Sequence, residues 1–142
     1  MISWGIIGFG RMGRQYVDCF KIKSDLFRLS GVSSKTSSNI KELNFYNSYE
    51  DLIKVKEIDA IYISTLNNTH RELVILANSY NKKILCEKPL GMNFSEVQEL
   101  HSLLKKKEEI FLEAIAYRAH PIIPTIFEIL NDKEIGQIKK IE

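Results

Sequence analysis

The sequence predicts an α/β fold built on a doubly wound parallel sheet, and two observations carry this prediction. Short apolar runs alternate along the chain with segments in which apolar residues recur at helical spacing. The runs are almost continuously apolar, as in Ile2–Gly8, which is typical of strands buried on both faces. Strands and helices that alternate in this way form a parallel sheet with helices on its faces.

The length and composition agree with one such domain. The chain has 142 residues, of which 44% are hydrophobic and 27% charged, so it can form a proper core and is not a low-complexity chain. No internal repeat and no interdomain linker is visible. We therefore expect a single domain over residues 1–142.

The expected elements follow from these patterns. Strands are expected at Ile2–Gly8, Phe27–Ser33, Phe45–Tyr46, Ile58–Ser64, Lys83–Cys86 and Ile110–Leu112. Helices are expected over Met12–Phe20, Tyr49–Val55, Leu73–Tyr80, Val97–Leu104 and Ile122–Leu130. Thr69-x-x-Glu72 matches a capping box at the start of a helix, and Asn93-x-x-Glu96 is expected to start another helix. Ser33–Asn39 is predicted to be a loop, and Ile135–Glu142 the start of another strand.

Charge and hydropathy exclude two classes of partner. Twenty basic against eighteen acidic side chains give a formal net charge of +2, with both signs mixed along the chain, so we expect no nucleic-acid binding. No apolar run approaches the roughly 18 residues that a membrane span needs, and the N-terminus lacks the basic segment of a signal peptide. Cys19 and Cys86 form neither a disulfide framework nor a metal site, so the expected location is a reducing cytoplasm.

Gly8-Phe9-Gly10-Arg11-Met12-Gly13 matches the pattern G-x-G-x-x-G between a predicted strand and a predicted helix. Gly8 permits the tight turn, Gly10 lets the backbone approach a pyrophosphate, and Gly13 lets helix and strand pack closely. The helix N-terminus then offers N–H groups and a partial positive charge to the phosphates. The alternative is a glycine-rich turn without a ligand, but the context favours a Rossmann-type dinucleotide-binding loop.

The end of the second strand bears on the choice between NAD and NADP. An NAD-binding domain usually places Asp or Glu about 20 residues after the glycines, on the 2′-hydroxyl of the ribose. That position falls in Val32-Ser33-Ser34-Lys35-Thr36, which contains no acid. Because hydroxyl and ammonium groups attract a 2′-phosphate, Ser34 and Lys35 favour NADP. The alternative, in which Lys35 is an exposed loop lysine beside a permissive ribose pocket, leaves NAD open.

Three further blocks, Asp59–His70, Lys83–Leu90 and Glu113–Pro121, carry a family resemblance. With the glycine loop, they resemble the N-terminal domain of the glucose–fructose oxidoreductase / inositol dehydrogenase (Gfo/Idh/MocA) family over essentially the whole chain. Glu87-Lys88-Pro89 after a strand is the most specific mark. Lys35 and the pattern Glu113…Arg118…His120-Pro121 most resemble the NADP-using sugar and dihydrodiol branch of the family.

The resemblance implies roles for the matching positions. It implies that the loop after the fourth strand lines the cofactor through Ser64, Thr65, Leu66, Asn67 and His70. Leu66 is often proline in relatives, so that turn can differ slightly. Glu87 and Lys88 would lie beside the nicotinamide ribose, with Lys88 taking part in catalysis, and Arg118 near the cofactor and the substrate side.

The residues themselves agree with these roles. Gly8, Ser34, Ser64, Glu87 and Glu113 all fall at or just past the carboxyl ends of predicted strands, which is where open α/β sheets bind ligands. A lysine there, Lys88, could polarise a carbonyl or help to move a hydroxyl proton. The alternative is a surface lysine paired with Glu87. The isomer of the Lys88-Pro89 bond is left open.

The histidines and Cys86 are weighed separately. His70 is expected as the first residue of its helix, with either a cofactor-facing or a helix-start role. His101 is expected to be structural, and local packing is the favoured role of His120. No two histidines have metal-ligand spacing, so we predict no metal. Cys86 is expected to be a small core residue and not a nucleophile.

The resemblance also implies a larger whole. Relatives continue into an α+β domain that supplies most of the substrate pocket, and residues 118–142 would lead toward it. The end of the chain inside a predicted strand favours truncation. The expected enzyme transfers hydride between NADP(H) or NAD(H) and a small sugar, polyol or dihydrodiol-like substrate, and the isolated chain would be catalytically incomplete.

Two alternatives stay open at this point. The chain could be a stand-alone nucleotide-binding or partner-binding module without catalysis. An apolar face exposed where a second domain would dock could also be covered by another chain, or could pair two copies into a homo-oligomer.

Overall fold

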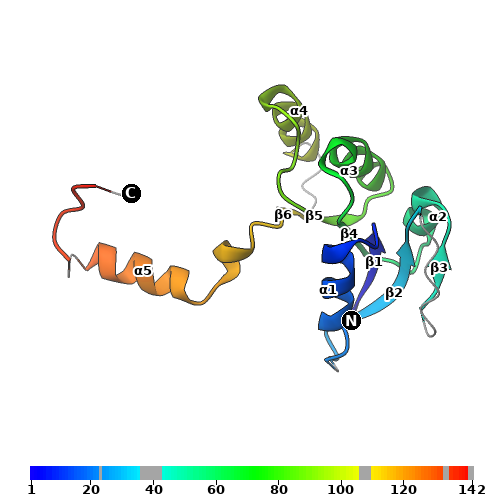
Figure 1. Cartoon of the computed structure of the whole chain (residues 1–142), viewed down its shortest axis with the longest axis horizontal. Helices are drawn as coiled ribbons and strands as arrows, with labels where there is room; N and C mark the ends of the chain where they lie inside the picture. The colour runs from blue at the N-terminus through cyan, green and yellow to red at the C-terminus, as the bar shows by residue number, and fades with distance from the viewer. Residues whose placement is uncertain (23, 36–42, 106–109, 133–134, 141–142) are drawn as a thin grey trace.

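The computed structural model describes residues 1–22, 24–35, 43–105, 110–132 and 135–140. Six strands form one parallel sheet in the order β3-β2-β1-β4-β5-β6 (Figure 1). The strands are β1 (Ile2–Ile7), β2 (Phe27–Ser33), β3 (Phe45–Tyr46), β4 (Ala60–Ile63), β5 (Lys83–Cys86) and β6 (Phe111–Glu113). This is the strand order of a Rossmann fold, so the predicted fold class is confirmed.

Helices cover both faces of the sheet, and these are α1 (Arg11–Cys19), α2 (Tyr49–Lys54), α3 (His70–Ser79) and α4 (Phe94–Lys105). A further helix, α5 (Ile122–Asn131), follows β6 in the chain. Successive residues of a strand point to opposite faces. On β1, Ile6 therefore packs on the face of α1, whereas Ile7 packs on the face that α2, α3 and α4 cover. The α1 face is aromatic, with the ring of Tyr16 4.1 Å from that of Tyr62 on β4.

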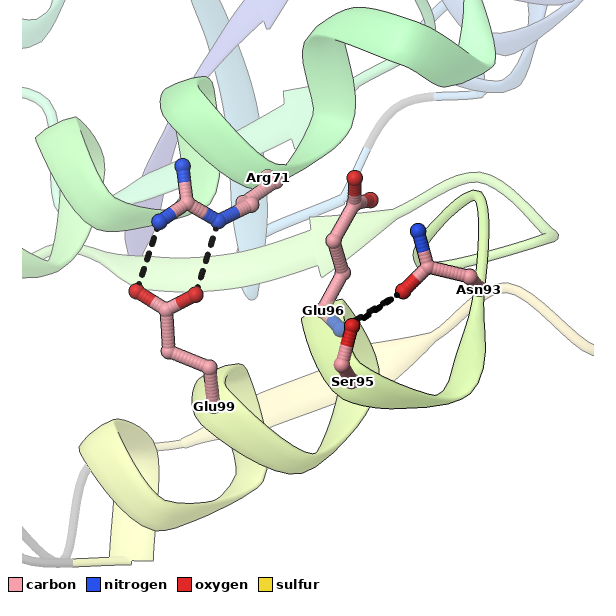
Figure 2. Close-up of polar contacts among 5 residues, drawn as sticks. All are labelled: Arg71, Asn93, Ser95, Glu96 and Glu99. Atoms are coloured by element: carbon pink, nitrogen blue, oxygen red, sulfur yellow. Dashed lines mark hydrogen bonds and ion pairs between the residues drawn. The ribbon is translucent and has the colours of Figure 1, made fainter.

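One side-chain cap and one ion pair stabilise the helices α3 and α4. Asn93 Oδ1 accepts hydrogen bonds from the backbone N–H of Glu96 at 3.1 Å and the hydroxyl of Ser95 at 2.6 Å (Figure 2). Asn93 therefore caps α4, which starts at the predicted place. Arg71 of α3 binds both carboxylate oxygens of Glu99 on α4, at 2.7 and 2.8 Å (Figure 2). Helices α3 and α4 are therefore joined by a bidentate pair.

The capping box predicted at Thr69-x-x-Glu72 is wrong. A 3₁₀ turn, η1 (Asn67–Thr69), leads directly into α3, which begins at His70. The Thr69 side chain makes no capping bond to α3. Its hydroxyl instead donates to the Leu66 carbonyl at 2.7 Å and lies 2.7 Å from the Thr65 hydroxyl. The preceding turn supplies closer partners and draws the hydroxyl away from the helix.

The C-terminal part lies apart from the sheet. After a second 3₁₀ turn, η2 (Ala116–Ala119), α5 extends away from the other elements (Figure 1). Its apolar residues are largely exposed, at 53% for Ile122 and 60% for Phe127. The strand predicted at 135–142 is wrong over the described residues 135–140, because these pair with no strand of the sheet. Residues 141–142, like positions 36–39 of the predicted loop, lie outside the described residues.

Candidate functional site

The carboxyl edge of the sheet brings together most of the predicted site residues. Gly8 follows β1, Ser34 follows β2, Ser64 follows β4, Glu87 follows β5, and Glu113 ends β6. Backbone hydrogen bonds keep these positions level, among them Ser64 N to Ile7 O at 2.8 Å and Glu87 N to Ile63 O at 2.9 Å. Since every strand of the sheet runs in the same direction, their ends form one continuous edge.

The glycine loop is tightly packed at two of its three glycines. Gly8 has φ +90°, and a Cβ there would lie 2.7 Å from the Ser64 carbonyl oxygen. A Cβ on Gly13 would collide with the carbonyl oxygen of Gly8. Gly10 differs, because a Cβ there would meet no atom within 4 Å. The loop therefore closes against β4 and α1 while Gly10 borders open space.

The N-terminus of α1 points its unbonded N–H groups into this loop. Gly10 is the N-cap, and glycine has no side chain that could bond to the start of the helix. The first backbone hydrogen bond of the helix runs from Arg14 N to Gly10 O at 3.1 Å. The N–H groups of residues 11–13 come before this bond and have no partner within the helix. Arg11 and Met12 are exposed, whereas Phe9 is buried in the α1 core. The geometry suits an anion held by backbone N–H groups.

The residues after β2 divide into buried and exposed positions. Ser33 and Ser34 are buried, and the Ser33 hydroxyl has no hydrogen-bond partner within the described part of the chain. Lys35 is exposed, with its Nζ 5.8 Å from the centre of the Tyr49 ring. It borders a pocket of about 540 Å³ together with Ser48. Thr36 lies outside the described residues.

The loop after β4 turns some of its predicted side chains inward and others outward. The Ser64 hydroxyl lies 2.9 Å from the Gly8 carbonyl oxygen and 3.2 Å from that of Ile7, so it holds the glycine loop. Leu66 is 76% exposed, and Asn67 is exposed beside it. Thr65 is half-buried and shares a hydroxyl contact with Thr69. The outward side chains are therefore those of Leu66 and Asn67.

His70 is fully buried, so its ring contacts backbone groups of the site and is not open to a ligand. Its Nδ1 lies 2.9 Å from the Pro89 carbonyl oxygen, and its Nε2 lies 3.3 Å from the Thr65 carbonyl oxygen. A carbonyl oxygen only accepts, so Nδ1 donates in the shorter contact. His70 thereby ties the start of α3 to the segment that contains Lys88. As predicted, His70 is the first residue of α3.

Lys88 is exposed beside a carboxylate that has another partner. Glu87 Oε1 accepts a hydrogen bond of 2.6 Å from the Tyr62 hydroxyl, and no ion pair joins Glu87 to Lys88 within the ranges described. The Lys88-Pro89 bond is cis. Glu113 Oε1 accepts from the Leu90 N–H at 2.9 Å. Arg118 is exposed on η2, at the start of the segment that leaves the sheet.

Tyr62 is the site residue that sequence analysis missed. It lies in the apolar run of β4 and is only 2% exposed. Burial and the Glu87 carboxylate raise the pKa of its phenol. The only signal in the sequence is one hydroxyl inside an otherwise apolar strand, which needs a hydrogen-bond partner when buried.

The remaining polar candidates take no visible part. Cys86 is buried, and burial, with smaller contributions from Glu113 and Glu87, raises the pKa of its thiol to about 12. The ring of His120 accepts a hydrogen bond from the Ile122 N–H at 3.1 Å, at the start of α5. Across the described segments, no group of three His, Cys, Asp or Glu side chains could hold a metal ion. No helix described is long and apolar enough to cross a bilayer.

The sheet order and the glycine loop at its carboxyl edge define the Rossmann class of dinucleotide-binding domains. Residues 2–114 match the family model described as an oxidoreductase family with an NAD-binding Rossmann fold, GFO_IDH_MocA. The chain therefore belongs to the Gfo/Idh/MocA oxidoreductase family. The family resemblance predicted from the sequence is confirmed.

Individual relatives agree with this assignment. Over 147 residues the chain is 30% identical to a trans-1,2-dihydrobenzene-1,2-diol dehydrogenase of Xenopus laevis, with 98% of this chain and 44% of that protein covered. The structure of myo-inositol 2-dehydrogenase from Lactobacillus plantarum has 29% identity and a TM-score of 0.86, covering 96% of this chain and 43% of that one. The chain thus spans less than half the length of these relatives.

A third comparison concerns the fold alone. The scyllo-inositol dehydrogenase of Lactobacillus casei, solved with NAD(H) and scyllo-inositol bound, shares 20% identity and superposes with a TM-score of 0.88. It covers 97% of this chain, and the match covers 43% of that enzyme. More than half of that enzyme lies outside the match to the 142 residues.

Proposed function

We propose that the chain binds NADP(H), with NAD(H) as a weaker ligand, as the cofactor domain of an oxidoreductase. The observation that carries this proposal is the open space at Gly10 over the uncapped start of α1. Gly8 packs against Ser64, and Gly13 packs against the carbonyl of Gly8. Gly10 is therefore the position where a pyrophosphate could approach the backbone of the loop. The fold and the donor groups therefore fit the cofactor that the family implies.

The other predicted residues would divide the remaining contacts. Lys35, exposed after a buried Ser34 and with no carboxylate in the segment Val32–Lys35, would bind the 2′-phosphate of NADP. Leu66 and Asn67 would line the cofactor from the loop after β4. Glu87, Lys88 and Arg118 would lie on the nicotinamide side. Ser64 and His70 would shape the site through the backbone groups that they bond.

The whole enzyme would act on a sugar, a polyol or a dihydrodiol, as the names of its relatives indicate for those proteins. The bound nicotinamide would supply the hydride donor or acceptor. Lys88, exposed after β5, would polarise the substrate carbonyl or move the hydroxyl proton. Residues 118–142 would lead toward a substrate domain, so we expect this chain alone to bind cofactor and turn over little substrate.

Calorimetric titration of the chain with NADPH and with NADH tests the proposal. We expect tighter binding of NADPH, and Lys35→Ala to weaken NADPH binding roughly tenfold while NADH binding changes little, because an ammonium–phosphate contact is lost. Gly10→Ala should weaken both ligands. Lys105→Ala, on the last residue of α4, is the matched control for loss of an exposed lysine. A folded chain that binds neither cofactor would contradict the proposal.

A further inference from the structure

The segment around Lys88 is held from three sides by side chains of three different elements. Tyr62 of β4 bonds to the Glu87 carboxylate, His70 of α3 to the Pro89 carbonyl, and Glu113 of β6 to the Leu90 N–H. Each residue that flanks Lys88 in Glu87–Leu90 therefore has its own anchor. Of the three anchors, Tyr62 alone bonds to a side chain of the segment, whereas the other two bond to its backbone.

Burial of the Tyr62 hydroxyl costs desolvation free energy, and the hydrogen bond to Glu87 offsets this cost. Its neighbours on β4 are Ile61 and Ile63, and its ring packs against Tyr16 in the α1 core. A buried hydroxyl without a partner is unfavourable, and phenylalanine would fill the same space without that cost. The hydroxyl instead makes a 2.6 Å bond to Glu87, which is the short length of a bond to a charged acceptor.

This bond determines how the Glu87 carboxylate is presented. The carboxylate is half-buried at the edge of the sheet, and its Oε1 is occupied by Tyr62. Oε2 has no hydrogen-bond partner among the residues that the structure describes. With one oxygen held, the side chain cannot rotate freely, and the second oxygen remains as an acceptor at a defined position.

We propose that Tyr62 is a positioning residue, which fixes the Glu87 carboxylate so that Oε2 can accept a hydrogen bond from a hydroxyl of the nicotinamide ribose. This inference rests on the proposed cofactor binding and goes beyond it, because it assigns a role to a buried residue that no ligand can touch. Tyr62 acts through Glu87, and its effect extends only to ligands that carry the nicotinamide ribose.

The inference is tested by comparing ligands that contain the nicotinamide ribose with ligands that lack it. Tyr62→Phe keeps the ring packed on Tyr16 and removes only the hydroxyl. We expect this variant to bind NADPH and NADH about tenfold more weakly, while the binding of 2′-phospho-ADP or ADP, which lack the second ribose, stays within about twofold. Tyr16→Phe is the matched control, since it removes a hydroxyl from the stacked ring and leaves the Tyr62–Glu87 bond in place.

A double-mutant cycle distinguishes an effect that acts through Glu87 from a general destabilisation of the fold. In a Glu87→Ala background, Tyr62→Phe should cost little further affinity, because the carboxylate through which Tyr62 acts is already absent. Equal weakening of NADPH and 2′-phospho-ADP by Tyr62→Phe would overturn the inference in favour of a purely structural role. Unchanged binding of both would overturn it while the proposed function stands. If the folded wild-type chain binds none of these ligands, the proposed function fails and the inference fails with it.

Discussion

The hydroxyl of Ser64 donates to the carbonyl oxygen of Gly8 at 2.9 Å and so joins the end of β4 to the glycine loop. The same carbonyl oxygen lies where a side chain on Gly13 would begin. Strand β4, the loop after β1 and the first turn of α1 therefore meet at one backbone oxygen. The shape of the loop depends on contacts too close to admit another atom.

Replacement of Ser64 tests the first of these contacts. Ser64→Ala removes the hydroxyl and leaves the Gly8 carbonyl without this donor, so we expect the free energy of unfolding to fall by about 1 kcal/mol. Urea unfolding followed by circular dichroism measures the change. The control is Ser79→Ala, which removes a hydroxyl that bonds to the Leu76 carbonyl at an exposed helix end. Equal losses in the two variants would show that the Ser64 bond has no special weight.

Gly13 and Gly10 offer a matched pair for the second contact. Gly13→Ala forces a methyl group against the Gly8 carbonyl, and since backbone must move to admit it, we expect a loss of roughly 1–3 kcal/mol. Gly10→Ala places its methyl group in open space at negative φ, so its unfolding midpoint should change much less. Chemical denaturation of both variants compares them. A Gly10 variant as unstable as the Gly13 variant would refute this account of the loop.

Much of the sheet could be predicted from the sequence because its strands are short segments rich in apolar residues. β4 is buried at every position, and the predicted bounds of the partly buried strands β2, β3 and β5 match the observed ones. The glycine spacing likewise placed the loop between β1 and α1. Partners across the fold are different, because they depend on register. Tyr62 reaches Glu87 because β4 and β5 pair with Ile63 opposite Cys86, and neither segment alone contains that information.

The capping box predicted from a local sequence pattern was wrong because a nearer hydrogen-bond acceptor competed. Thr69-x-x-Glu72 fits the pattern, yet the turn Asn67–Thr69 places the Leu66 carbonyl within 2.7 Å of the Thr69 hydroxyl. For α5, helical spacing predicted the element but not its surroundings, since Ile126 and Phe127 are exposed. Periodicity shows which side of a helix is apolar and does not show what covers it.

The two cysteines should react very differently with thiol reagents. Cys19 is exposed on α1, whereas Cys86 is buried and its thiol pKa is raised to about 12, so little thiolate is present near neutral pH. We expect one rapidly labelled thiol in the native chain and two in denaturant. Iodoacetamide labelling at pH 8 with intact-mass analysis gives the count, and Cys19→Ser should leave the native chain unlabelled. Rapid labelling of Cys86 in that variant would contradict the burial of its thiol.

The pH dependence of stability above neutral pH follows from the raised pKa values of Cys86 and two tyrosines. Burial, with a smaller contribution from Cys19, raises the pKa of Tyr16 to about 12, and burial with Glu87 raises that of Tyr62, against an ordinary value of 10.0 for a phenol. Between pH 10 and 12 the unfolded chain has lost these protons and the native chain has not. The native state then binds more protons, so the free energy of unfolding falls as pH rises.

We therefore expect nearly constant stability up to about pH 8, a decline from about pH 9 as the unfolded chain loses the Cys86 proton, and a steeper decline above pH 10. Tyr16→Phe removes one raised phenol and should make the slope above pH 10 shallower, by up to about 1.4 kcal/mol per pH unit. Guanidinium unfolding at pH 7 to 11 measures the slope. Tyr117→Phe is the control, because Tyr117 is 68% exposed on η2. If the Tyr16 variant declines as steeply as the Tyr117 variant, the buried phenol is not what limits stability at high pH.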